Sequence, residues 1–120
     1  MDRERTQRAN HSISTHVLDT SIGRPASEVA IKLLRQQGAD WVEVFAGVTD
    51  GDGRVPALGD VRPEPGAWRL TFDAGGYFAR RGTESFYLIV SIDFVLRSAD
   101  AHYHVPLLIS PFGYSTYRGS

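Results

Sequence analysis

The sequence predicts a single all-β domain built as an antiparallel sandwich or barrel. Short segments alternate apolar and polar residues with a period of two, which is typical of strands with one buried face. Turn signals rich in glycine and proline separate these segments and leave little room for helices. The 120 residues suffice for one hydrophobic core but not for two.

Seven segments have the alternation or the β-branched and aromatic content of strands. In chain order they are Ser12–Leu18, Ser27–Gln37, Trp41–Thr49, Trp68–Asp73, Ser85–Leu96, His102–Ile109 and Tyr114–Tyr117. The second segment also fits a short amphipathic helix, but the alternation of Val29, Ile31 and Leu33 favours a strand. The third segment is predicted to be a two-faced strand. One face has Val42, Val44, Ala46 and Val48, and the other has Trp41, Glu43, Phe45, Gly47 and Thr49.

Turn signals and one short helix connect these strands. The turns are predicted at Gly23-Arg24-Pro25, Asp50-Gly51-Asp52-Gly53, Pro63-Glu64-Pro65-Gly66, Gly75-Gly76 and Ser110-Pro111-Phe112-Gly113. The best position for a helix is Gly76–Arg81. No repeat or linker divides the chain, so we expect one domain over residues 12–120, preceded by a flexible polar tail at residues 1–11.

Composition excludes several classes of function. The formal net charge is -1 and the isoelectric point is near 6.4, which disfavours a nucleic acid or an acidic membrane surface as partner. Without cysteine there are no disulfides, thiolate nucleophiles or thiolate metal sites. No apolar run resembles a secretory signal or approaches the roughly 20 residues that span a bilayer. These properties predict a soluble cytoplasmic protein.

Three histidines are candidates for chemistry. His16 shares a strand face with Ser12 and Ser14, so that face is polar and either lines a cleft or lies on the surface. His102 and His104 project from one face if their segment is extended, and such a pair can share a proton or bind a metal. A zinc site with His16 as the third ligand remains an alternative.

Arg54 follows the Asp50–Gly53 turn, where a loop passes into the next extended segment. Its guanidinium could clamp an anionic or carbonyl-rich ligand through two hydrogen bonds, or it could pair with Asp50 or Asp52 as an exposed loop residue. The turn resembles part of a calcium loop, but Val61 occupies the twelfth position, where that loop needs an acidic residue. We therefore exclude calcium.

The C-terminal segment lacks the usual polar, frayed character of a chain end. It combines a phenol, a guanidinium, a glycine and a carboxylate within Tyr117, Arg118, Gly119 and Ser120. From the residues alone this ending is either part of a site or a last strand followed by a short cap.

Taken together, these segments resemble the transthyretin-like 5-hydroxyisourate hydrolases. The resemblance covers the chain from His11 onward and is carried by four stretches: Ser14-Thr-His-Val-Leu-Asp-Thr with Gly23-Arg-Pro-Ala, Thr49-Asp-Gly-Asp-Gly-Arg, Leu70-Thr-Phe-Asp-Ala-Gly-Gly-Tyr-Phe, and His102 to Ser120. The terminal Tyr-Arg-Gly-Ser is the most specific of them, because it separates the hydrolases from the hormone-carrying transthyretins. Asp50, where the family commonly has Asn, and Leu88, where it often has Pro, are mild departures.

The resemblance implies a sandwich of two four-stranded antiparallel sheets with one short helix, assembled as a homotetramer with sites at a subunit interface. It implies hydrolysis of 5-hydroxyisourate to 2-oxo-4-hydroxy-4-carboxy-5-ureidoimidazoline in urate breakdown, in the cytoplasm or peroxisome, without a cofactor or metal. His16, Arg54 and His104 match the family's catalytic residues, with either histidine as the general base. Tyr117, Arg118, Gly119 and Ser120 match its substrate-binding terminus.

Two alternatives to this function remain at this point. One is a carrier with the same sandwich, which would hold a small aromatic ligand in a channel between subunits. Against it, a carrier has no use for a base together with an oxyanion donor. The other is a zinc hydrolase that uses the three histidines, and activity that survives a chelator would remove it.

Overall fold

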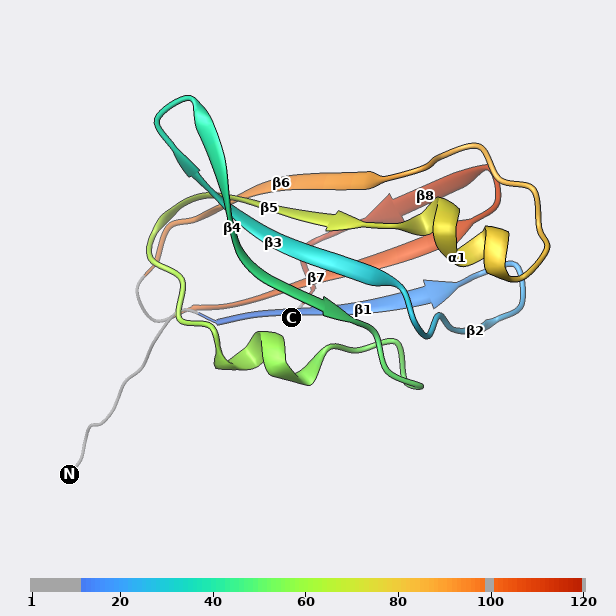
Figure 1. Ribbon diagram of the computed structural model, residues 1–120. Coiled ribbons are helices and arrows are strands. Elements are labelled where there is room, and N and C mark those ends of the chain that lie inside the picture. The colour runs from blue at the N-terminus through green and yellow to red at the C-terminus, as the bar shows by residue number, and fades with distance from the viewer. Residues whose placement is uncertain (1–11, 99–100, 120) are drawn as a thin grey trace.

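The computed structural model describes residues 12–98 and 101–119, which form two packed four-stranded sheets (Figure 1). The predicted tail at residues 1–11 lies outside the described residues, and so does Ser120. One sheet has the strand order β2-β1-β7-β8 and the other β4-β3-β5-β6. The strands are β1 (Ser12–Asp19), β2 (Arg24–Pro25), β3 (Ala30–Gln37), β4 (Asp40–Val48), β5 (Gly66–Phe72), β6 (Val90–Leu96), β7 (His102–Ser110) and β8 (Gly113–Thr116).

The predicted sandwich of two four-stranded sheets is confirmed, but one strand pair is not antiparallel. β1 and β7 run parallel, in register from Ser12 opposite His102 to Asp19 opposite Ile109. Every other pair in the two sheets is antiparallel. The expectation of purely antiparallel sheets was wrong here because residue patterns within each strand do not encode the direction of a distant partner. This register decides which polar side chains meet on the sheet.

An extra residue in β4 changes which of its side chains face the core. Leu33 pairs with Phe45, whereas the next residue, Leu34, pairs with Glu43. Phe45 packs against the core, while the Glu43 carboxylate lies 3.5 Å from the Lys32 ammonium on the outer face. The prediction that Glu43 and Phe45 share a face was wrong, because the bulge at this point reverses the alternation.

Apolar side chains from both inner faces fill the space between the sheets. In β1 every second residue is buried, as the period-two pattern predicted. The largest fully buried side chains are Phe72, Phe78, Ile13, Ile31, Leu33, Leu58, Leu70, Leu96, Leu107 and Ile109. Buried apolar area of this kind is the main stabilising contribution to such a sandwich.

The α-helix α1 (Ala74–Arg80) begins two residues before the predicted start. Its first turn contains Gly75 and Gly76, which we had assigned to a turn. The Asp73 carboxylate accepts a hydrogen bond from the Gly76 N–H at 2.9 Å and so caps the helix. Gly75 lies close to the backbone of Leu88, where an added Cβ would be 3.0 Å from the Leu88 Cα. Glycine therefore serves close packing here rather than a reversal.

Three further details differ from the sequence prediction. The two-residue strand β2 was assigned to a turn, and the 3₁₀ helix η1 (Pro56–Asp60), which buries Leu58, was not predicted. The sixth strand begins at Val90 rather than at Ser85. The preceding residues Phe86, Tyr87, Leu88 and Ile89 are exposed instead. Packing within this chain therefore does not account for the apolar character of these four residues.

Candidate active site

The parallel register of β1 and β7 gathers hydroxyl and imidazole groups on the outer face of the first sheet. Ser12 lies opposite His102 and Ser14 opposite His104, while His16 lies two residues further along β1 on the same face. The residues between them on β1 point into the core. The structure thus brings together the three histidines that the sequence singled out.

Arg54 lies beside this face because the loop after β4 pairs with the backbone of β1. The Val17 N–H donates to the Gly53 carbonyl at 2.8 Å, and His16 pairs with Arg54 as an isolated antiparallel bridge. Gly53 has a positive φ of 75°, and a Cβ there would lie 2.3 Å from the Val17 carbonyl oxygen. Only glycine allows the loop to come this close, and the contact places Arg54 beside His16.

The Asp50 carboxylate holds the loop from within. Its Oδ1 accepts hydrogen bonds from the backbone N–H groups of Asp52 at 2.9 Å and of Arg54 at 3.0 Å. Within residues 12–98 and 101–119 no ion pair joins this carboxylate to the Arg54 guanidinium. Asp50 thus shapes the turn through the backbone, in the manner of an Asx turn.

The C-terminal tail reaches the same face through Gly119. The Gly119 N–H donates to the His104 carbonyl at 2.8 Å, and the two residues form an antiparallel bridge. Its backbone packs on the imidazole, because a Cβ at Gly119 would lie 2.6 Å from the His104 Cδ2. The tail therefore limits the positions that the His104 ring can adopt.

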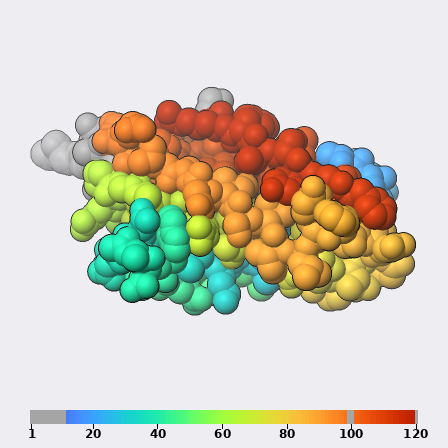
Figure 2. Space-filling view, turned by 90° about the horizontal axis from the view of Figure 1, so that it is seen from above, coloured from blue at the N-terminus to red at the C-terminus, as the bar shows by residue number. Residues whose placement is uncertain are grey.

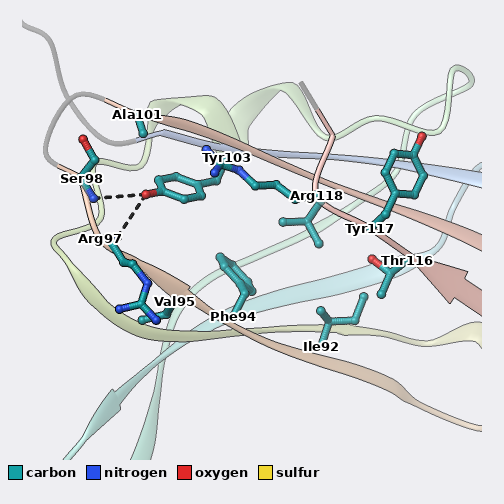
Figure 3. Close-up of a pocket in the computed structure, with 11 residues that line it drawn as sticks. Ile92, Phe94, Val95, Arg97, Ser98, Ala101, Tyr103, Thr116, Tyr117 and Arg118 are labelled. Carbon is teal, nitrogen blue, oxygen red and sulfur yellow. Dashed lines mark hydrogen bonds between the residues drawn. The ribbon is translucent and has the colours of Figure 1, made fainter.

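Arg118 and Tyr117 lie elsewhere. The Arg118 guanidinium carbon lies 4.4 Å from the centroid of the Tyr103 ring, on the face of β7 opposite to His104. Figure 3 shows Arg118 directed toward Tyr103 and the Tyr117 ring turned to one side. Tyr117 is 61% exposed. The four terminal residues therefore do not converge on the imidazoles in this chain: Gly119 contacts His104, Arg118 does not, and Ser120 lies outside the described residues.

Arg118 and Tyr117 line a cavity of about 600 Å³ that opens between β6 and the β7–β8 side (Figure 3). Its walls are mainly apolar and include Ile92 and Phe94. At one end the Tyr103 hydroxyl accepts hydrogen bonds from the backbone N–H groups of Arg97 at 3.1 Å and Ser98 at 3.2 Å. The cavity and the imidazole face are thus separate surfaces on the two sides of β7.

The pKa of His104 is lowered from its ordinary value. Partial burial is the main cause, because it disfavours the imidazolium, and the electrostatic effects of Arg54, His102 and His16 act in the same direction. A hydrogen bond with the Ser14 backbone opposes them. The net effect favours the neutral imidazole, which is the form that can accept a proton.

A chain of hydrogen bonds connects the histidines of β7 to the serines of β1. Ser14 Oγ lies 2.7 Å from His104 Nδ1 and 2.9 Å from His102 Nε2, and Ser12 Oγ lies 2.6 Å from His102 Nδ1. Sequence reasoning placed Ser12 and Ser14 on the polar face of His16 but did not connect them to His102 and His104. The signal would have been the Ser-x-Ser and His-x-His spacings, which match in a parallel register.

Comparison with known proteins assigns the chain to a family. The model of the HIUase/Transthyretin family matches residues 13–119. The chain belongs to the HIUase/Transthyretin family. The resemblance inferred from the sequence motifs is thereby confirmed.

Relatives in the HIUase/Transthyretin family match over most of the chain. A Caenorhabditis elegans protein named as a probable 5-hydroxyisourate hydrolase is 46% identical over 110 residues, which cover 91% of this chain and 82% of the relative. The solved structure of Klebsiella pneumoniae 5-hydroxyisourate hydrolase is 39% identical, with a TM-score of 0.80 over 91% of this chain and 99% of that one. Sea bream transthyretin in complex with thyroxine is 28% identical, with a TM-score of 0.85 over 89% and 93% of the two chains.

The described residues contain neither a metal-binding cluster nor a membrane-spanning helix. Within residues 12–98 and 101–119, no group of three or more His, Asp or Glu side chains is placed to hold a metal ion. Nor does this part of the chain contain a helix with the length and apolar character needed to cross a bilayer.

Proposed function

We propose that this protein hydrolyses 5-hydroxyisourate to 2-oxo-4-hydroxy-4-carboxy-5-ureidoimidazoline. The Caenorhabditis elegans and Klebsiella pneumoniae relatives carry the name of this hydrolase at 46% and 39% identity. The observation that carries the proposal is the meeting of His16, Arg54 and His104 on one sheet face, where a carrier would need neither a base nor a fixed cation.

The proposed reaction needs a positioned water, a base and a donor for the developing oxyanion. We assign the base to His104, because its lowered pKa favours the neutral imidazole that can accept a proton. Water attacks a ring carbonyl carbon, His104 removes its proton, and the proton passes to the nitrogen that leaves as the C–N bond breaks. The residues require no cofactor for these steps.

Arg54 has a different role, because its guanidinium does not lose a proton near neutral pH. Its fixed charge would bind the oxygens of the substrate and stabilise negative charge in the transition state. His16, which pairs with Arg54 along the sheet edge, would orient the substrate or the water. Tyr117, Arg118, Gly119 and Ser120 are proposed to contribute to substrate binding once the site is assembled.

We further propose a homotetramer in which a second subunit completes each site. The imidazole face is an open sheet face, with His16 and His104 half-buried and Arg54 exposed. Elsewhere on the chain, a strip of apolar side chains is exposed: Phe86, Tyr87, Leu88, Ile89, Val95, Phe112 and Tyr114. Figure 2 shows that the segments which carry this strip, orange and red, lie side by side. Such a strip is typical of a subunit interface.

We propose the cytoplasm as the site of action, in line with the cysteine-free composition.

The test is an ultraviolet assay in which urate oxidase forms 5-hydroxyisourate and the protein is added. We expect the absorbance to decay faster with the protein than without it. His104→Ala and Arg54→Ala should each lower turnover by about two to four powers of ten without unfolding the domain. Activity should persist in a chelator. An unchanged decay rate with the wild-type protein would refute the hydrolase and favour the carrier, and near-normal activity in both variants would refute the residue assignment.

A further inference from the structure

A single hydroxyl bridges two imidazoles on the proposed catalytic face. Ser14 Oγ lies 2.7 Å from Nδ1 of His104 and 2.9 Å from Nε2 of His102. The other ring nitrogen of His102, Nδ1, lies 2.6 Å from Ser12 Oγ. Four groups from two parallel strands thus form one continuous chain of hydrogen bonds.

Counting protons limits how this chain can be arranged. A serine hydroxyl has one proton, so it can donate to only one of its two imidazole partners. If Ser14 donates to His104 Nδ1, the neutral His104 carries its proton on Nε2. If Ser14 instead donates to His102 Nε2, His104 carries its proton on Nδ1 and donates it to Ser14. In that case His102 donates from Nδ1 to Ser12. In the first arrangement the directions are reversed, with Ser12 donating to His102 Nδ1 and His102 donating from Nε2 to Ser14, so both arrangements satisfy every group in the chain.

Only the second arrangement makes His104 a base on the side away from Ser14. There Nε2 has a free lone pair, and proton uptake at Nε2 leaves every hydrogen bond of the chain unchanged. In the first arrangement Nε2 already carries a proton and Nδ1 faces a donor, so proton uptake requires the chain to reverse.

We propose that Ser14 and His102 are positioning residues that hold His104 in the tautomer protonated on Nδ1, so that Nε2 serves as the general base. This statement rests on the proposed hydrolase function, because the hydrogen-bond distances fit both arrangements and only the second leaves Nε2 of His104 free to act as the base. The packing of Gly119 on the ring complements the hydrogen bond, because together they limit both the rotation and the tautomer of His104.

The kinetic test compares Ser14→Ala with Ser14→Thr, which keeps the hydroxyl, and with Ser91→Ala, an exposed serine in the other sheet. We expect Ser14→Ala to lower kcat about 10- to 100-fold, the usual effect of losing an orienting partner, with little change in KM. Ser14→Thr should recover most of kcat, and Ser91→Ala should match the wild type. His102→Ala should lower kcat by a smaller factor than Ser14→Ala. Wild-type kcat in Ser14→Ala would overturn the proposal.

A second readout does not depend on activity. Nitrogen-15 spectra of histidine-labelled protein at pH 8 distinguish a protonated ring nitrogen from an unprotonated one. We expect His104 to carry its proton on Nδ1 in the wild type and to exchange between tautomers in Ser14→Ala. A wild-type His104 protonated on Nε2 would overturn the inference even if the protein hydrolyses 5-hydroxyisourate. The expected tautomer in a protein without that activity would instead overturn the proposed function alone.

Discussion

The backbone of Gly119 lies directly against the imidazole of His104, so closely that a Cβ at Gly119 would come within 2.6 Å of the ring Cδ2. The same glycine donates its N–H to the His104 carbonyl at 2.8 Å. The C-terminal tail and the proposed base are therefore one structural unit.

Gly119→Ala should lower turnover by about tenfold or more, because the new methyl group must displace the His104 ring, and small displacements of a catalytic group are costly. The folding transition should move little, since the substitution lies near the end of the chain. Gly113→Ala is the matched control, because its Cβ would be 3.6 Å from Ser110 Oγ, an ordinary contact. Equal activity in the two variants would show that the ring is not held by the tail.

Gly53→Ala should destabilise the protein by about 1 to 3 kcal/mol. The backbone there has a positive φ, and the added Cβ would lie 2.3 Å from the Val17 carbonyl oxygen, so the loop must move away from β1. Gly51→Ala, in the same loop but with nothing within 4 Å of its Cβ, should change stability much less. Urea unfolding of both variants measures the difference, and indistinguishable midpoints would contradict the prediction.

Arg54→Gln should move the acid limb of the kcat/KM profile to higher pH. The Arg54 charge lowers the pKa of His104, so its removal raises that pKa, and the imidazole then becomes protonated at a higher pH. The rate at pH 8 should also fall, because an oxyanion donor is lost. Arg62→Gln is a control, since the Arg62 guanidinium bonds to the carbonyls of Gly59 and Val61. An unshifted limb in Arg54→Gln would mean that His104 does not control it.

Tyr77→Phe should destabilise the fold by about 1 to 3 kcal/mol, since the Tyr77 hydroxyl donates to the buried Asp19 carboxylate at 2.8 Å. Burial and this hydrogen bond raise the pKa of Tyr77 from its ordinary value of 10.0 to about 12. The folded state thus favours the neutral phenol, and this contribution is complete below pH 10 and is lost as the pH rises toward 12.

Urea titrations of the wild type and Tyr77→Phe between pH 8 and 11.5 measure this loss. The stability difference between them should shrink as the pH rises. Tyr87→Phe, which alters an exposed tyrosine, is the control. A difference that stays constant across this range would show that Tyr77 does not titrate as stated.

Leu88→Asp should dissociate the proposed tetramer and abolish activity together, because Leu88 is 75% exposed within the apolar strip. Val48→Asp is the matched control: it places the same charge at a 54% exposed valine on the opposite edge strand, β4. Size-exclusion chromatography with an activity trace compares the two. An active Leu88→Asp monomer would exclude a site shared between subunits.

Period-two alternation, or a high content of β-branched and aromatic residues, was enough to locate seven of the eight strands. The pattern could not give the parallel direction of the β1–β7 pair, because the two strands are 90 positions apart in the sequence. It also missed the bulge in β4 opposite Leu33 and Leu34, which changes the facing of side chains within that strand alone. Strand β2 was missed because two residues are too few to show an alternation. Phe86–Ile89 looked like a strand because exposed apolar residues have the same composition as buried ones.

The site was predictable to the extent that short motifs carry it. His16, Arg54 and His104 do meet on one face, but the motifs do not state on which side of β7 each terminal residue lies. Arg118 points to Tyr103 because adjacent residues of an extended tail alternate in direction, and Gly119 takes the position facing His104. The Ser14 bridge required the strand register, which depends on three-dimensional pairing.

The parallel pairing of β1 with β7 also affects the stage of folding at which the site can first become active. Ser14 and His104 can meet only after a loop of about 90 residues closes, which is slow compared with forming the β3–β4 and β5–β6 neighbours. A refolding chain can therefore acquire most of its second sheet before the first one has both of its central strands. Recovered enzymatic activity should then lag behind the recovery of β-sheet circular dichroism, and the delay would time the closure of the first sheet.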